Sequence, residues 1–340
     1  MIWPRIAGLA LLLAGTAPVF AQQPLPASLT PSKTPLTTAV APIPGASTGG
    51  VIGPAQNYLA PGVAPDLAFG AFQRGYYVTA MREAMQRISA NPNDAPAMTL
   101  MGELYRDGLG LRRNPEEALR WYRLAAARGD TPAIFALAMA YLQGSGVTAD
   151  PAAARPLLEK AAAAGHPGAL YNLGLLVIGG EIQDFARSAD LFRRAADLGN
   201  LEAAYALGLQ YRQGRGVKRD PLLAAQWLKY AADEGLAAAQ IEYAIMTFNG
   251  TDGVPRDEAR AARYFMKAAA TNNPVAANRL ARLLATGRGV PKNMVEAMKW
   301  HILARTAGIK DDWLDGQLNS LSARDRALVE EAVRRHIGGA

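Results

Sequence analysis

The side chains that could perform acid–base, nucleophilic or metal chemistry are few in this sequence. The 340 residues include no cysteine and only three histidines, His166, His301 and His336. These histidines lack the spacing of metal ligands and fall in separate helical or turn segments, far apart along a linear array of helices. They therefore predict neither a zinc site nor a catalytic triad. Ser-x-x-Lys and His-Glu-x-x-His patterns are absent. We expect no enzyme activity, no cofactor and no metal.

Two recurring patterns look like ligand-binding motifs but have a simpler explanation. Gly-x-Gly pairs such as Gly214 and Gly216 could bind phosphate, yet they follow a predicted helix and not a strand. Aspartates and asparagines also recur, but no second carboxylate stands at a fixed spacing that would suggest acid–base catalysis. An Asp side chain at the start of a helix accepts hydrogen bonds from the free amides there. Both patterns therefore predict helix boundaries.

Residues 201–236 show the elements that these boundaries delimit. Small and aromatic side chains share one face of a first helix, which the Gly-x-Gly pair ends. Asp220 followed by Pro221 starts a second helix, because proline lacks only an amide hydrogen that has no partner in the first turn. Trp227 lies on the apolar stripe of this helix, and Gly235 can adopt the left-handed conformation that closes it. The segment is predicted to be a helical hairpin.

This hairpin recurs six times along the chain. The predicted caps of the second helices are Asn114, Asp150, Asp184, Asp220, Asp257 and Asn293. Fifteen residues after each cap stands Gly129, Gly165, Gly199, Gly235, Asn272 or Gly308, types that tolerate positive φ. Each first helix has a small residue where a neighbouring helix can approach closely: Gly102, Ala138, Gly174, Gly208, Ala244 and Ala281. One hairpin cannot bury both of its faces, so stacked copies must share a core.

The run Ala-x-x-x-Leu-Gly-x-x-Tyr, Gly-x-Gly-Val, an acidic or amide cap, Trp, Ala-Ala and Gly resembles the Sel1-like repeats, relatives of the tetratricopeptide repeats. The resemblance covers residues 97–308, and the Gly-x-Gly turn separates it from a plain 34-residue tetratricopeptide unit. It implies an all-α fold, a right-handed α/α superhelical solenoid of helix-turn-helix repeats of about 36 residues. Some secreted members staple each hairpin with a disulfide, whereas this chain has no cysteine. The third copy is shorter and the fifth longer.

The first 65 residues predict a signal for export followed by a tether. Residues 1–21 carry Arg5, an apolar run and the small-x-small signal that ends at Ala21, so we expect a signal peptide cleaved after Ala21. A retained anchor is disfavoured, because the run is shorter than the roughly 20 residues that span a membrane. Residues 22–65 have nine prolines and one charge, Lys33, and are predicted to be a disordered tether. A docking strip for a partner is the alternative. The mature chain is expected to be periplasmic or secreted and not to span a membrane.

The remaining residues divide into an array and its two ends. Residues 66–92 predict a degenerate N-terminal helical hairpin, residues 93–310 the six repeats, and residues 311–340 capping helices that begin near Trp313. Ser322 and Asp325 form the expected capping box of the last helix. The formal net charge of +7 is mild and scattered among acidic residues, which argues against a nucleic-acid partner. A monomer is expected.

What remains for function is a surface. In tetratricopeptide-like solenoids the first helix of each hairpin lines the concave side, and the resemblance implies the same here. Apart from Arg212, three positions of these helices are apolar in the middle repeats, with charge at Glu103, Arg106 and Arg282 on the fringe. The predicted partner-binding residues are Phe135, Met139, Leu142, Tyr171, Leu175, Ile178, Tyr205, Leu209, Arg212, Ile241, Ile245 and Phe248. A large apolar patch on a soluble chain usually indicates a partner. The alternative is that these side chains are core.

The sequence thus favours a non-catalytic scaffold or adaptor of the bacterial cell envelope, which binds a partner protein or an extended peptide on the concave face. The family resemblance implies roles in complex assembly, signalling or cell-wall processes. Two alternatives stay open. One is a secreted regulator of an enzyme or a host-directed effector. The other is a cell-wall glycan-acting or glycan-binding protein, which would use carboxylates such as Glu202, Glu242 and Asp257.

Overall fold

The computed structural model describes residues 66–180 and 183–338, and in these ranges it contains sixteen helices and no strand. The predicted all-α class is therefore confirmed. The predicted signal peptide and tether lie outside the described residues. The helices are α2 (Leu67–Gln73), α3 (Tyr77–Ala90), α4 (Ala95–Asp107), α5 (Pro115–Ala127), α6 (Thr131–Gln143), α7 (Pro151–Ala163), α8 (Pro167–Gly179), α9 (Phe185–Asp197), α10 (Leu201–Gln213), α11 (Pro221–Asp233), α12 (Ala237–Asn249), α13 (Glu258–Ala270), α14 (Pro274–Thr286), α15 (Met294–Thr306), α16 (Asp312–Asn319) and α17 (Ala323–Gly338).

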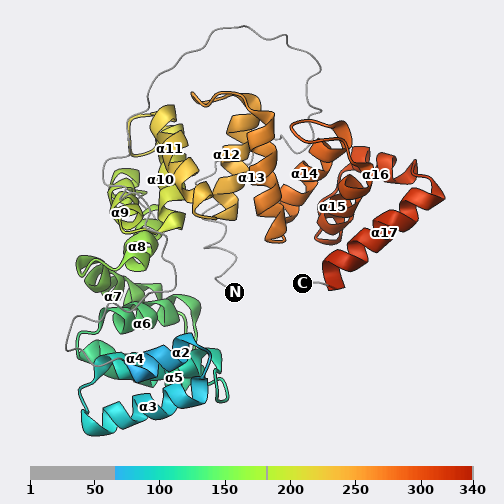
Figure 1. The fold of residues 1–340 in the computed structure, drawn as a ribbon. Coiled ribbons are helices and arrows are strands. Elements are labelled where there is room, and N and C mark those ends of the chain that lie inside the picture. Colours follow the sequence, from blue (N-terminus) through green and yellow to red (C-terminus); the bar gives the residue numbers. More distant parts are fainter. Residues whose placement is uncertain (1–65, 181–182, 339–340) are drawn as a thin grey trace, which may run out of the picture. The chain divides into compact units, whose positions relative to one another are not determined.

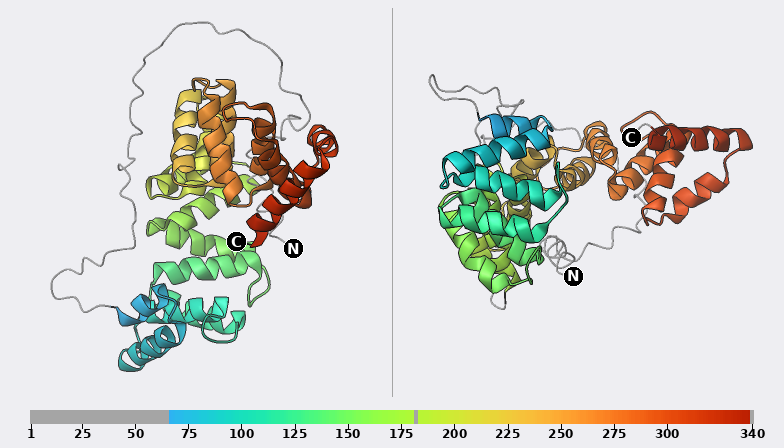
Figure 2. Two further views of the ribbon diagram at one scale, coloured as in Figure 1. Left: turned by 45° about the vertical axis from the view of Figure 1, so that its right-hand side comes forward. Right: turned by 90° about the horizontal axis from the view of Figure 1, so that it is seen from below.

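The chain forms two compact units, one ending at Asn200 and the other beginning at Leu201. In unit 1, α4 pairs with α5, α6 with α7 and α8 with α9, and each pair packs against the next (Figure 1). In unit 2 the pairs are α10 with α11, α12 with α13 and α14 with α15. Both views of Figure 2 show these antiparallel hairpins within each unit. The predicted array of helical hairpins is confirmed.

All six second helices begin at the predicted caps, and their first turns explain why. Asn114, Asp150, Asp184, Asp220, Asp257 and Asn293 are the N-cap residues of α5, α7, α9, α11, α13 and α15. The Asp220 carboxylate, for example, accepts a hydrogen bond of 2.9 Å from the Leu223 amide. Such a bond satisfies one of the amides that have no partner within the helix.

The helix ends also follow the predicted pattern, with one departure. The six residues fifteen positions after the caps all have positive φ, including Asn272 at 60°. The first helices α4, α6, α12 and α14 end at left-handed glycines. The shorter third repeat differs, because α8 ends at Gly180 in an extended conformation. In the longer fifth repeat, the non-glycine residue Asp252 takes a φ of 53°.

Small residues on the first helices let the paired helix approach closely. A Cβ built on Gly102 would lie 2.4 Å from the Tyr122 ring, and one on Gly174 would lie 2.6 Å from the Phe192 ring. On Gly208 it would lie 2.9 Å from Leu228 Cγ. Any larger side chain would displace these buried partners. The close helix contacts that the sequence predicts are therefore present in both units.

Helices outside the repeats pack against the first and the last repeat. At the N-terminal end, α2 and α3 pack on α4 through an apolar cluster that includes Met101 and Leu104, but they leave Phe69 and Tyr76 exposed. At the C-terminal end, α17 packs on α15. The predicted capping box starts α17, where the Asp325 amide donates to Ser322 Oγ at 3.1 Å. Asp311 joins α16 to α14 through hydrogen bonds from Arg282 and Asn278.

Candidate protein-binding surface

The twelve predicted binding residues divide into two groups by burial. Five belong to the core: Leu142, Leu175, Ile178, Leu209 and Phe248. The other seven are half-buried: Phe135, Met139, Tyr171, Tyr205, Arg212, Ile241 and Ile245. The residue three positions before the small glycine or alanine is half-buried in each of the four middle repeats, so this position meets solvent. The residue four positions after it faces the core wherever it is apolar. A partner can therefore reach mainly the seven half-buried residues.

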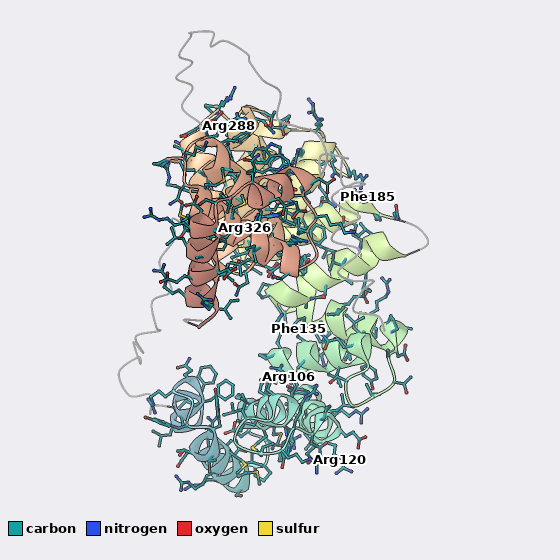
Figure 3. All side chains as sticks on the ribbon, turned by 90° about the vertical axis from the view of Figure 1, so that its right-hand side faces the viewer. Arg106, Arg120, Phe135, Phe185, Arg288 and Arg326 are labelled. Atoms are coloured by element: carbon teal, nitrogen blue, oxygen red, sulfur yellow. The ribbon has the colours of Figure 1, made fainter. Side chains whose placement is uncertain are left out.

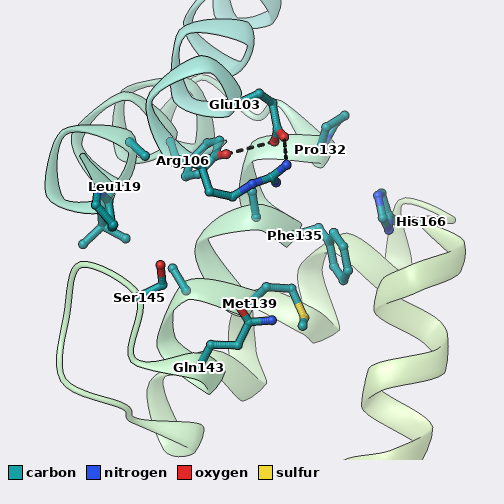
Figure 4. A pocket seen from close by; sticks show the side chains of 14 residues that line it. Glu103, Arg106, Leu119, Pro132, Phe135, Met139, Gln143, Ser145 and His166 are labelled. Carbon is teal, nitrogen blue, oxygen red and sulfur yellow. Dashed lines mark hydrogen bonds and ion pairs between the residues drawn. The ribbon is translucent and has the colours of Figure 1, made fainter. Parts of the chain in front are cut away.

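Unit 1 contains a groove of about 430 Å³ between the α4–α5 hairpin and α6. Its wall includes Phe135 and Met139, two of the predicted residues, which lie one turn apart on α6 (Figure 4). Arg106 lies near Phe135 in unit 1, whereas Arg120 lies apart from them on α5 (Figure 3). The groove also has polar lining from Glu103, Arg106, Gln143, Ser145 and His166. In this groove the predicted apolar residues Phe135 and Met139 lie close to the predicted fringe charges Glu103 and Arg106.

Contacts from the start of α8 hold the Phe135 ring in place. The His166 ring stacks on it, with ring centroids 4.3 Å apart and an interplanar angle of 26°. A Cβ on Gly168 would lie 2.9 Å from Phe135 Cζ, so the absence of a side chain there makes room for the ring. Stacked and offset aromatic pairs of this kind add to the free energy of simple burial. The groove therefore has one rigid aromatic wall.

The charged groups at the rim of the groove are paired with one another. Tyr122 donates a hydrogen bond of 2.9 Å to Glu103 Oε1, and the Arg106 guanidinium forms an ion pair with the other oxygen of Glu103. Arg106 also binds the Asp107 carboxylate through two hydrogen bonds of 2.8 and 2.7 Å. Burial raises the pKa of Glu103 above its usual value, although Arg106 and Tyr122 act in the opposite direction. Burial also raises the pKa of the Tyr122 hydroxyl.

Three side chains bring unused hydrogen-bonding groups to the groove. The Gln143 amide and the Ser145 hydroxyl have no hydrogen-bond partner among the described residues. His166 caps α8, and its Nδ1 accepts a hydrogen bond of 3.2 Å from the Ala169 amide. The neutral ring therefore carries its proton on Nε2. Burial lowers the pKa of His166, which favours this neutral form. Each of the three side chains can donate one hydrogen bond to a ligand.

In unit 2 the predicted residue Arg212 belongs to an ion-pair network. Its guanidinium lies 3.0 Å from Glu242 and 3.2 Å from Asp252, and Arg219 lies 3.9 Å from the same aspartate. These pairs join the fourth repeat to α12 and to the long loop of the fifth. Arg212 thus has ion-pair partners within unit 2, which its place in the repeat does not predict. Glu242 is engaged here and Asp257 caps α13, so these carboxylates have structural partners.

Two predicted residues of unit 2 form a partly solvated apolar strip on α12. Ile241 and Ile245 lie one turn apart on α12 and are half-buried. Phe248, on the same helix, is covered by the Arg288 guanidinium, which lies 4.3 Å from the ring centroid. Arg288 is itself paired with Glu258. A cation over an aromatic face stabilises the packed state. Among the predicted residues of α12, the two isoleucines are therefore the ones that solvent reaches.

The histidines are placed differently from the sequence expectation. His166 is a half-buried helix cap in the groove wall, and nothing in its local pattern shows this, because the ring at the start of α8 meets Phe135 on α6. His301 is fully buried, and its Nε2 lies 2.9 Å from Asp315 Oδ1. The His336 ring meets the Trp300 ring edge-on, beside His301, because α17 packs on α15. These two histidines are therefore closer than a linear array implies.

The repeat pattern also does not predict that Gln143 and Ser145 line the groove. Gln143 ends α6 and Ser145 lies in the following turn, positions that vary between repeats without a fixed chemical type. Within residues 66–180 and 183–338, no group of three or more His, Asp or Glu side chains is placed to hold a metal ion. Across the same residues, every helix is too short or too polar to cross a membrane.

Comparisons with known proteins agree with the repeat pattern. The chain is 30% identical to a Sel1 repeat protein from Oxalobacter formigenes of known crystal structure. The alignment covers 71% of this chain and 97% of that one, with a TM-score of 0.61. It is 33% identical over 114 residues to an uncharacterized protein of Neisseria meningitidis, and 27% identical over 157 residues to the chitin synthase regulator SKT5 of Saccharomyces cerevisiae. These two matches cover 34% and 46% of this chain but only 23% and 22% of the relatives' own lengths.

A family model described as Sel1 repeat gives the same periodicity as the hairpins. It matches residues 95–130, 131–166, 167–200, 201–236, 237–273 and 274–309, so that each match contains one first helix and one second helix. Sel1 repeat proteins generally mediate protein–protein interactions, and their fold is typically a non-catalytic scaffold. With the caps, the left-handed turns and the close glycine contacts all in this register, the chain belongs to the Sel1 repeat family.

Proposed function

We propose that this protein is a non-catalytic adaptor of the bacterial cell envelope, which binds a partner protein or an extended peptide through the solvated face of its first helices. The observation that carries the proposal is the groove of unit 1. It combines a fixed aromatic wall at Phe135, the adaptable side chain of Met139 and unused donors on Gln143, Ser145 and His166. Ligand sites commonly join an apolar wall to a few polar groups that fix orientation.

The envelope location is part of the same proposal. It is supported by the signal-peptide pattern of residues 1–21, with its apolar run and its small-x-small ending at Ala21. Detection of a mature chain that begins at Gln22 in the periplasmic or culture fraction would support export. A chain that keeps Met1 and stays with the cytoplasmic fraction would contradict it.

Site-specific crosslinking in the native envelope tests the binding proposal. A photo-reactive amino acid is placed at Ile245 on the partly solvated strip of α12, and at Gln143 in the groove. Leu222, which is exposed on α11, is the control position. We expect adducts with a specific envelope protein from one or both test positions and none from Leu222. Equal labelling at all three positions, or no adduct from the test positions, would contradict the proposal.

Regulation of an enzyme is the second candidate function, and one observation favours it. The chain is similar over 157 residues to a protein named as a chitin synthase regulator. The captured partner separates the candidates. If it is an enzyme whose rate changes when purified adaptor is added, the regulatory role is supported. A rate that stays constant across saturating adaptor concentrations would exclude it for that partner.

A further inference from the structure

The groove of unit 1 has the chemistry of a site for an uncharged, proline-containing segment. Its charged residues, Glu103 and Arg106, are paired with each other, so the groove offers no single free charge to a ligand. Phe135 and Met139 offer apolar contact area, and His166 Nε2, the Gln143 amide and the Ser145 hydroxyl can each donate a hydrogen bond. A proline residue presents an apolar ring and a carbonyl acceptor but no backbone donor. Donors beside an aromatic wall therefore suit such a residue.

The chain itself supplies a segment of this composition. Residues 22–65 contain nine prolines and a single charged residue, Lys33, and they include apolar side chains such as Tyr58 and Leu59. The segment ends directly before Asp66, which caps α2 in unit 1. The α2–α3 hairpin packs on α4, whose hairpin forms one side of the groove. The segment is thus attached to the unit that carries the site.

The distance between the attachment point and the groove is short for a segment of this length. Packed helices lie about 8–10 Å apart, so two successive hairpins span on the order of 20 Å. An extended chain covers up to about 3.3–3.6 Å per residue, so roughly ten residues before Asp66 are enough to reach the groove. Tethering also raises the effective concentration of a short linked ligand to the millimolar range. Even a weak intrinsic affinity then gives high occupancy.

We propose that the groove of unit 1 binds the chain's own proline-rich segment, residues 22–65, so that a partner must displace this segment to reach Phe135 and Met139. The contact is intramolecular and partly occludes the binding surface. It provides a reason for a long uncharged segment to precede the repeats. The competition with a partner rests on the proposed function, whereas the contact itself does not.

Photo-crosslinking in the purified mature protein tests this contact. A benzophenone amino acid is placed at Gln143 or, in a second variant, at Pro132, both exposed residues that line the groove. The control is the same probe at Leu124, which is exposed on α5 but does not line the groove. We expect adducts within one chain between the groove probes and residues 22–65, with a yield that does not depend on protein concentration. The control should give no such adducts.

A variant of the groove wall links these adducts to the proposed contacts. His166→Asn keeps a side-chain acceptor that can cap α8 but removes the ring on Phe135 and its Nε2 donor. Loss of one hydrogen bond corresponds to about a five-fold weaker contact. The yield from the Pro132 probe should therefore fall, by up to about that factor when the wild-type groove is not saturated. The melting temperature of the variant, measured in parallel, shows that the fold is retained.

Three results would overturn the inference. The first is that groove adducts form only with other residues of unit 1 or not at all. The second is that the yield rises in proportion to protein concentration, which indicates a second copy. The third is an unchanged yield in folded His166→Asn. Crosslinking in the native envelope is a separate readout. If it still captures a partner from Gln143 or Ile245, the adaptor function stands although the intramolecular contact is wrong.

Discussion

Replacing Asp311 by alanine is expected to detach the C-terminal cap from the sixth repeat. The Asp311 side chain is only 4% exposed, and it accepts hydrogen bonds from Arg282 Nε at 2.6 Å, from a second Arg282 nitrogen at 2.7 Å and from Asn278 Nδ2 at 2.8 Å. It also caps α16 through the Leu314 amide at 3.2 Å. Alanine would remove all four acceptor contacts at once.

The magnitude follows from the burial of the charge that would be left behind. The Arg282 side chain is 22% exposed, so Asp311→Ala leaves a largely buried guanidinium without its carboxylate. Breaking a buried ion pair in this way costs about 3–5 kcal/mol. The lost helix cap contributes to the same change and is not an independent addition. We therefore expect a total of about 3–5 kcal/mol for the α14–α16 contact.

The assay must report local stability, because in repeat proteins each hairpin depends mainly on its neighbours. Hydrogen exchange of the α16 and α17 amides is the suitable measurement. Asp312→Asn is the matched control, since Asp312 is the exposed neighbour and lies in the first turn of α16. We expect faster exchange in α16 for Asp311→Ala and wild-type exchange for Asp312→Asn. Equal exchange in the two variants would refute the reasoning.

Four further predictions concern the pH dependence of Asp311 and the contacts of Gly102, Leu209 and Arg212. Burial alone would raise the pKa of Asp311, but the bonds from Arg282, Asn278 and Leu314 outweigh it and hold this pKa below 3.8. The stability that Asp311 provides is therefore fully present above that pH and is lost as the pH falls through the folded-state pKa. A pH titration of unfolding should show this loss in the wild type and not in Asp311→Asn. Gly102→Val should destabilise unit 1 by about 1–3 kcal/mol in chemical denaturation, because its Cβ meets the Tyr122 ring at 2.4 Å, whereas Gly316→Ala, with open space around it, should be neutral or stabilising. Leu209→Ala at a core position should cost about 2–5 kcal/mol, and half-buried Ile245→Ala clearly less, when both are compared by thermal unfolding. Arg212→Ala should cost only about 1 kcal/mol, because its ion pairs are partly solvated, and a double-mutant cycle with Asp252→Ala would measure their coupling.

The hairpins could be predicted from the sequence because their boundaries depend on local interactions. An aspartate such as Asp220 caps the helix that begins one residue later, and a glycine such as Gly235 closes it, so neither requires knowledge of the rest of the fold. The close contacts of Gly102 and Gly174 were predictable for a related reason. A small residue at a constant place in every repeat indicates that a neighbouring helix is near.

The groove could be predicted only in part, because it depends on side chains that different repeats bring together. Phe135 and Met139 were found from their place in the repeat, but the position of His166 against Phe135 depends on how the next repeat packs. Likewise, the place of Arg212 in the repeat indicates a surface residue, whereas in the fold the carboxylate of Asp252, a residue with positive φ, lies beside it. Such contacts depend on residues and loops that differ between repeats, and a pattern shared by all repeats does not contain them.

The most direct test of the binding account measures partner capture and thermal stability in one variant, Met139→Ser. Met139 is half-buried in the groove wall, so its replacement removes apolar contact area for a ligand and little of the core. We predict that capture of the envelope partner is lost while the melting temperature falls by no more than about 2–4 °C, the shift that about 1 kcal/mol produces in a domain of roughly 150–250 residues. Unchanged capture, or a loss of capture accompanied by a large fall in melting temperature, would contradict partner binding through the groove.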